Sequence, residues 1–209
     1  FIEGAGKSFS AGADIDMMRT AGHLTFKDNV DKAREFAHML QRLRQIPMPS
    51  VALVNGAAMG GGVGLVAACD IAVAVKSAFF SFSEVRLGLI PSMISPYVIE
   101  AIGPRAARRY FTTGERFDAE EARRIGLVHV VVDNMEQMAK ESERLANEFF
   151  RNAPDSMTEA KRLVDAVMWR EIDHHLVEDT ARRIAERRAT DEAKEGTTAF
   201  LEKRSPDWA

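Results

Sequence analysis

The three consecutive glycines Gly60–Gly62 are the first feature of this sequence that could do chemistry. They follow a short β-branched run, Val51–Val54, and open an apolar stretch that extends to Cys69. This order predicts a strand, an irregular turn and a buried helix. The first amides of a helix have no intrahelical acceptor, and the helix dipole adds partial positive charge there. The run could therefore bind a phosphate, or an oxygen that becomes negative during a reaction. Equally, the glycines could serve only the tight packing of helix on strand.

Glu84 is the acidic residue best placed for proton transfer. It follows the aromatic run Phe79–Phe82 and is succeeded by Val85 and Leu87. A carboxyl group among apolar side chains is desolvated, which raises its pKa toward the range useful to a general acid or base. The alternative is a glutamate that faces solvent, as most glutamates do. The sequence leaves both interpretations open.

A second segment, Phe9–Ile15, crowds small residues around Gly12. Such a composition is unusual inside a strand or a helix. Glycine and alanine would let the backbone approach a ligand closely, whereas the simpler interpretation is a surface loop.

Other kinds of site find little support. The single cysteine, Cys69, lies in the apolar stretch and is expected to be a core residue, and the absence of a disulfide framework fits a reducing, cytoplasmic compartment. His38 has no partner at ligand spacing, so no metal site is expected. A net charge of −3 and a pI near 6.0 argue against nucleic-acid binding. The uncharged stretch from Gln45 to Cys69 raises the alternative of a membrane span, but its glycines and prolines disfavour one.

The flanking segments predict the elements that position these residues. Helical periodicity, proline breaks and a capping-box spacing are the signals used. The expected elements are helices over 26–46, 94–102 and 104–113, strands over 70–75, 78–82 and 127–132, and a helix begun by Asp118 and ended by Gly126. Beyond Asp133 the sequence is almost wholly amphipathic helix. We therefore expect a core over residues 1–132 and a helical C-terminal region over 133–209.

Three stretches together resemble the crotonase (enoyl-CoA hydratase/isomerase) superfamily: SFSAGADI (8–15), NGAAMGGGVGLVAACDIAVA (55–74) and FSFSEVRLGLIP (80–91). Their order and separations are specific, and the resemblance continues to residue 208. It implies an α/β fold of the ClpP/crotonase type, a spiral of ββα units with a helical C-terminal trimerisation region, assembled as a homotrimer or a dimer of trimers. Family chains usually carry about fifty further residues before the first motif. The strands and the part of the coenzyme A contact that they supply are expected to lie outside this numbering.

The resemblance also implies roles for individual residues. The main-chain amides of Ala13 and Gly61 would bind the thioester oxygen of an acyl-CoA substrate, and Glu84 would be the catalytic acid/base. The residues implied to contact coenzyme A are Ala11, Ala13, Asp14, Ile15 and Gly61, with Phe200 and Lys203 reaching the coenzyme A of a neighbouring subunit. Coenzyme A enters as part of the substrate, so no separate cofactor is expected.

Gly64 departs from the family pattern. Typical hydratases carry at this position a second glutamate, which polarises the water, and glycine has no side chain for that task. In other branches an aspartate eight residues after the Glu84 position does this work, but here that residue is Ser92. A two-glutamate hydration is therefore in doubt, and an isomerase that shuttles a proton with one glutamate is the alternative.

The segment Ile94–Tyr97, with Gly64 and the FLEKR ending (200–204), most resembles two kinds of bacterial enzyme. They are the methylglutaconyl-CoA hydratases of leucine breakdown and the isohexenylglutaconyl-CoA hydratases of terpene breakdown. Both substrates are branched, unsaturated and carry a second carboxylate. That carboxylate, or a pocket residue not identified by sequence, would help to hold the water, and Arg86 is either its partner or a solvated arginine. A homologue that only binds coenzyme A or RNA is the remaining alternative, although net acidity counts against RNA.

Overall fold

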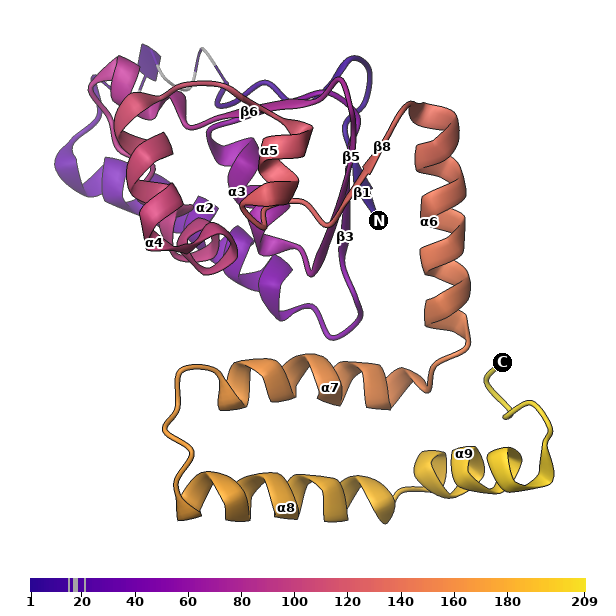
Figure 1. Ribbon diagram of the computed structural model, residues 1–209. Helices are drawn as coiled ribbons and strands as arrows, with labels where there is room; N and C mark the ends of the chain where they lie inside the picture. The colour runs from indigo at the N-terminus through magenta and orange to yellow at the C-terminus, as the bar shows by residue number, and fades with distance from the viewer. Residues whose placement is uncertain (15, 17–18, 21) are drawn as a thin grey trace. The chain divides into compact units, whose positions relative to one another are not determined.

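The computed structural model describes residues 1–14, 16, 19–20 and 22–209 (Figure 1). The chain forms two compact units. The core unit comprises Phe1–Ile46 and Ser50–Ser142, and the helical unit comprises Pro47–Pro49 and Glu143–Ala209. The expected division at residue 133 stays a prediction of domain organisation. Ile15, one of the residues implied to contact coenzyme A, lies outside the described residues.

The core unit is built on two four-stranded sheets. The first has the order β1 (Ile2–Glu3), β3 (Val51–Val54), β5 (Ile71–Val75) and β8 (Val130–Val132), and each neighbouring pair is parallel. The second has the order β2 (Ser8–Ser10), β4 (Ala57–Met59), β6 (Phe79–Ser81) and β7 (Phe117–Asp118). Here β2, β4 and β6 are parallel and β7 is antiparallel. From β1 to β6, successive strands alternate between the two sheets, which is the spiral of ββα units that the resemblance implied.

The helices of the core unit are α2 (Phe26–Gln45), α3 (Gly61–Ala68), α4 (Ser95–Thr113) and α5 (Ala119–Arg124). A 3₁₀ helix, η1 (Ser83–Leu87), follows β6. Figure 1 shows α2, α3, α4 and α5 on the same side of the sheet that contains β3 and β5. Helix α3 carries apolar residues on all sides, as expected for a helix that is enclosed by protein rather than lying on the surface.

Local signals explain where several helices begin and end. The Thr25 hydroxyl accepts a hydrogen bond from the Asp28 amide at the start of α2. The Asp118 carboxylate accepts one from the Glu121 amide at 2.8 Å, which confirms the predicted cap of α5. Within α4, Gly103 has φ 72° and ψ 161° directly before Pro104. The two short helices predicted here are therefore the two halves of one kinked element.

Several short strands lie where no strand was predicted, and β2 and β4 are the two that lead into the glycine-rich segments. Ala57–Met59 forms β4 in the segment expected to be an irregular turn, and Ser8–Ser10 forms β2 at the start of the small-residue segment. Phe9 is buried in β2. Each of these strands has only three residues, so its existence depends on pairing with distant parts of the chain rather than on local propensity.

The helical unit contains the end of α6 (Met135–Phe150), α7 (Pro154–Val167), α8 (His174–Arg188) and α9 (Asp191–Glu202). The Glu192 carboxylate of α9 accepts hydrogen bonds from the amides of Asp155 and Ser156 at the start of α7, at 2.9 and 3.0 Å. Large apolar side chains of this unit are exposed in the single chain, among them Trp169, Ile172 and Phe200. Within the described part of the chain, no helix combines the length and apolar character needed to cross a membrane.

A clamp between Ser50 and Asp70 joins the starting ends of β3 and β5. The amide and hydroxyl of buried Ser50 both donate to Asp70 Oδ2 at 2.8 Å, and the Asp70 amide donates to Ser50 Oγ at 3.0 Å. Hydrogen bonds to a charged group contribute about 1.5–3 kcal/mol, and losing the acceptor leaves a buried amide unpaired. We predict that Asp70→Ala lowers the free energy of unfolding by about 2–3 kcal/mol.

Urea unfolding followed by circular dichroism measures this loss. The matched control is Asp207→Ala. The Asp207 side chain is 89% exposed, and its ion pair with Arg204 is long, at 3.9 Å. The control should change stability little. Equal effects of the two substitutions would contradict a structural role for the clamp.

Candidate active site

The candidate site lies where three parallel strands of the second sheet end. Strand β2 leads into residues 11–14, β4 leads into Gly60–Gly62, and β6 leads into Ser83–Glu84. Because carboxyl ends of parallel strands share one edge of a sheet, the pairing brings these three segments to the same edge. Ligands of α/β proteins characteristically bind outside such edges.

Gly60 makes the turn between β4 and α3. Its backbone has φ 50° and ψ −118°, in the region that favours glycine, and its amide donates to the Ser81 carbonyl at 2.9 Å. Helix α3 begins at the next residue, so the amides of Gly61 and Gly62 are its first two and have no acceptor within the helix. Their partial positive charge suits an anionic oxygen.

The Glu84 carboxylate lies against this turn. Its Oε1 atom is 3.1 Å from the point that a Cβ atom on Gly60 would occupy. Glu84 is half-buried, and its Oε2 atom is buried with no hydrogen-bond partner among the described residues. Burial raises the pKa of Glu84 above its ordinary value, although the residue's own backbone amide acts in the opposite direction. The acid is therefore turned into the protein beside the first amides of α3, as an acid/base requires.

Gly64 has no room for a side chain. A Cβ atom there would lie 2.2 Å from Cγ2 and 2.7 Å from Cβ of Ile94, whereas real Cβ atoms do not approach other atoms within 3.0 Å. Ile94 is only 2% exposed. The sequence identified Gly64 as the departure from the family pattern, but it gave no signal that Ile94 occupies the vacated volume.

The remaining residues implied to bind coenzyme A fall into two groups. Ala11, Ala13 and Asp14 are exposed and follow β2 at the carboxyl edge of the sheet, beside β4. Phe200 and Lys203 belong to the helical unit, where Phe200 is 82% exposed and Lys203 ends α9 with φ 57°. The pairing of the Ala13 and Gly61 amides on one oxygen, and every coenzyme A contact, stay predictions.

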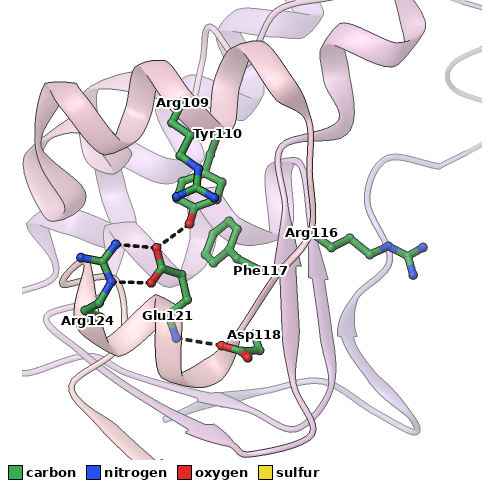
Figure 2. Close-up of a pocket in the computed structure, with 7 residues that line it drawn as sticks. All are labelled: Arg109, Tyr110, Arg116, Phe117, Asp118, Glu121 and Arg124. Carbon is green, nitrogen blue, oxygen red and sulfur yellow. Dashed lines mark hydrogen bonds and ion pairs between the residues drawn. The ribbon is translucent and has the colours of Figure 1, made fainter.

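A separate pocket of about 500 Å³ opens between α4, β7 and α5 (Figure 2). In it Tyr110 donates a hydrogen bond to Glu121 at 2.5 Å, and Arg124 pairs with both Glu121 oxygens. Pairing with Arg124 lowers the pKa of Glu121 to about 2, and burial, with the Glu121 hydrogen bond, raises the pKa of Tyr110 to about 12. Because these groups satisfy one another and Glu84 is not among the lining residues, we interpret the pocket as structural.

The chain matches the family model described as Enoyl-CoA hydratase/isomerase over residues 1–209. It is 34% identical over 209 residues to a short-chain-enoyl-CoA hydratase of Clostridium acetobutylicum, covering 97% of this chain and 77% of the relative. An enoyl-CoA hydratase structure from Shewanella pealeana superposes with a TM-score of 0.93 at 42% identity, over 97% of this chain and 76% of that one. The structure of Pseudomonas aeruginosa AtuE superposes with a TM-score of 0.94 at 37% identity, over 98% and 79%.

The burial of Glu84 should make the stability of the fold depend on pH. A carboxyl whose pKa is higher in the folded chain binds its proton more tightly when folded, so stability falls as pH rises from the ordinary value of 4.5 through the raised pKa. We therefore expect Glu84→Gln to be at least as stable as the wild type near pH 7, with the difference shrinking toward pH 4. Thermal unfolding at several pH values measures it.

Glu171→Gln is the control for the change of charge, since Glu171 is exposed in the helical unit. A Glu84→Gln protein that is markedly less stable than the wild type at neutral pH would show that the carboxylate supports the fold, contrary to the geometry described above.

Proposed function

Because the chain belongs to the enoyl-CoA hydratase/isomerase family, we propose that it adds water to, or eliminates it from, a branched, unsaturated acyl-CoA thioester. The observation that carries the proposal is the Glu84 carboxylate packed against Gly60, beside the first amides of α3. Such a pair provides both parts of enolate chemistry, namely a proton-transfer group and donors for a developing oxyanion. The relatives named as hydratases support water as the second substrate.

The proposed reaction uses one carboxylate of the protein. The thioester oxygen accepts hydrogen bonds from the amides of Gly61 and Ala13. Glu84, as carboxylate, takes a proton from water while the water oxygen bonds to the β-carbon, and the double-bond electrons move to the thioester oxygen as an enolate. The enolate then reforms the carbonyl as Glu84 returns its proton to the α-carbon. Water is added in full, and Glu84 is regenerated. Its raised pKa makes it a stronger base than an exposed glutamate.

We further propose a methylglutaconyl-CoA-type substrate, which is branched and carries a second carboxylate. This proposal rests on the resemblance at Ile94–Tyr97 and Gly64 and on the lack of a second acid at position 64. The substrate's own carboxylate would help to hold the water. Arg86 is exposed on η1, so a substrate carboxylate can approach it. Its Nε atom lies 3.3 Å from the point that a Cβ atom on Gly114 would occupy.

A second candidate function is isomerisation of a 3-enoyl-CoA to a 2-enoyl-CoA. The specific observation in its favour is Ile94, whose hydrocarbon side chain lies where a water-holding group would be expected. Glu84 would remove a proton from the α-carbon and return one to the γ-carbon, with no water involved. The same oxyanion donors would serve both reactions.

Absorbance of the conjugated thioester separates the candidates. We expect purified protein to consume a branched trans-2-enoyl-CoA, with loss of absorbance, and to act little on 3-enoyl-CoA. Glu84→Gln should lower kcat at least about 100-fold, the lower end for general acid–base catalysis. The wild-type rate should also fall as pH decreases through the raised pKa of Glu84, because the carboxylate form is required.

Gain of absorbance with 3-enoyl-CoA would identify an isomerase instead. No change with either ester would leave a binding protein. Turnover by Glu84→Gln near the wild-type rate would remove Glu84 from the mechanism.

We also propose that the helical unit takes part in assembly as a homotrimer or a dimer of trimers, and that Phe200 and Lys203 contact coenzyme A across a subunit boundary. The exposed aromatic ring of Phe200 and the other exposed apolar side chains of this unit support the proposal.

Lys203→Ala should therefore raise KM for the acyl-CoA several-fold and leave kcat nearly unchanged, because a phosphate-binding cation contributes to ground-state and transition-state binding equally. Steady-state kinetics measures the change. The control is Lys194→Ala, since Lys194 lies on the same helix and pairs with Asp191 at 2.9 Å. The same KM for both variants would exclude Lys203 from coenzyme A binding.

A further inference from the structure

Gly60, directly before α3, and Gly64, within α3, each leave a space that the side chain of another residue occupies. The Gly64 amide donates to the Gly60 carbonyl at 3.4 Å, so the two residues lie about one helical turn, roughly 6 Å, apart along the axis. A Cβ atom on Gly60 would meet Glu84, and one on Gly64 would meet Ile94. Glu84 and Ile94 therefore meet the start of α3 at two positions that are one helical turn apart.

Ile94 is held firmly in this position. It precedes the first residue of α4, with φ −88° and ψ −17°, and its carbonyl accepts a hydrogen bond from the Val98 amide at 3.1 Å. Its side chain is 2% exposed and β-branched, which restricts its χ1 angle. The Ile94 side chain is thus a fixed apolar wall against Gly64.

This wall has a chemical consequence. Water that attacks a β-carbon must be held and deprotonated beside it, which is the work of a polar group. The Glu84 carboxylate meets Gly60, and one helical turn further along α3 the hydrocarbon side chain of Ile94 fills the space at Gly64. An apolar surface can position an acyl branch but does not accept a hydrogen bond from water.

We propose that Ile94 is a specificity-determining residue, matched to Gly64. By filling the volume of a second acid, it restricts hydration to thioesters that bring their own polar group near the β-carbon, such as the branched substrates with a second carboxylate. This inference rests on the proposed function and adds the residue that selects the substrate class. It predicts that a simple straight-chain enoyl-CoA is a poor substrate for the wild type.

The experiment rebuilds the polar wall. In the double variant Gly64→Glu with Ile94→Gly, the isoleucine atoms that block position 64 are removed, and glycine is acceptable at a helix N-cap. Hydration of but-2-enoyl-CoA and of 3-methylglutaconyl-CoA is measured by absorbance for four proteins: wild type, each single variant and the double variant. We expect the double variant to raise kcat/KM for but-2-enoyl-CoA at least about 10-fold, because general acid–base groups contribute 10²–10⁴-fold.

Neither single variant should show this gain. Gly64→Glu alone keeps the overlap with Ile94, and Ile94→Gly alone opens space without a carboxylate. Three results would overturn the inference: a wild type that hydrates both esters equally well, a folded double variant without gain, or the same gain in either single variant. Failure of the wild type on every enoyl-CoA would instead overturn the proposed function, and the inference with it.

A second pair of variants serves if the double variant does not fold, as judged by circular dichroism. Ile94→Thr and Ile94→Val have nearly the same shape, but only threonine places a hydroxyl in the wall. We expect Ile94→Thr to exceed Ile94→Val several-fold in kcat/KM for but-2-enoyl-CoA, although the buried hydroxyl makes Ile94→Thr the less stable of the two. Equal values for the two variants would overturn the role of Ile94.

Discussion

The contact between the Glu84 carboxylate and the bare Cα of Gly60 is the constraint on which the rest of the site depends. With Oε1 only 3.1 Å from the place of a Cβ atom, any side chain at position 60 would force the carboxylate to shift by a few tenths of an ångström, and the φ of 50° also favours glycine. The absence of that side chain puts a proton-transfer group directly beside the first amides of a helix. A glutamate next to a helix N-terminus offers both a proton-transfer group and donors for an oxyanion. These are the two groups that enolate chemistry needs.

The fold supplies this adjacency through strand register. Parallel pairing of β4 with β6 sets Met59 opposite Ser81, and the Gly60 amide continues the ladder by donating to the Ser81 carbonyl. From that fixed point α3 begins on one strand and η1 begins on the next. A slip of one residue would turn the alternating side chains to the opposite face and separate the acid from the amides.

Burying a carboxyl group here lowers the stability of the fold near neutral pH. Glu84 is partly desolvated, one of its oxygens has no partner among the described residues, and its pKa is raised accordingly. The surrounding core offsets this cost with fully buried side chains such as Val63, Val66 and Phe80. A structural glutamate would instead be paired, as Glu121 is with Arg124 and Tyr110. This contrast within one chain is the physical reason for proposing Glu84, rather than Glu121, as the functional carboxylate.

The sequence predicted the parts of the molecule that are governed by local signals. The helix over 26–46, the strand over Val51–Val54, the apolar helix after Gly60–Gly62 and the Asp118 cap were all recognisable from residue types and spacing. The glycine run and Glu84 were also the sequence's candidates for chemistry, although their adjacency was not visible along the chain.

Features set by distant contacts could not be predicted in the same way. Strands β2 and β4 have three residues each, and their pairing creates them. Ile94 looked like an ordinary apolar residue at a helix start, because nothing in its neighbourhood along the sequence reveals that it fills the space beside Gly64. Phe200 and Lys203 belong to the helical unit, so the role implied for them depends on contacts that the single chain does not contain.

The central claim is that the amides at the start of α3 and the Glu84 carboxylate act together on the α-carbon of a thioester. Deuterium exchange tests it without depending on which enoyl substrate is natural. A saturated branched acyl-CoA is incubated with the protein in deuterated water, and the label at the α-carbon is measured by mass spectrometry. The account predicts label with the wild type and none above background with Glu84→Gln. Equal labelling by the two proteins, or none with a folded wild type that binds the ester, would contradict it.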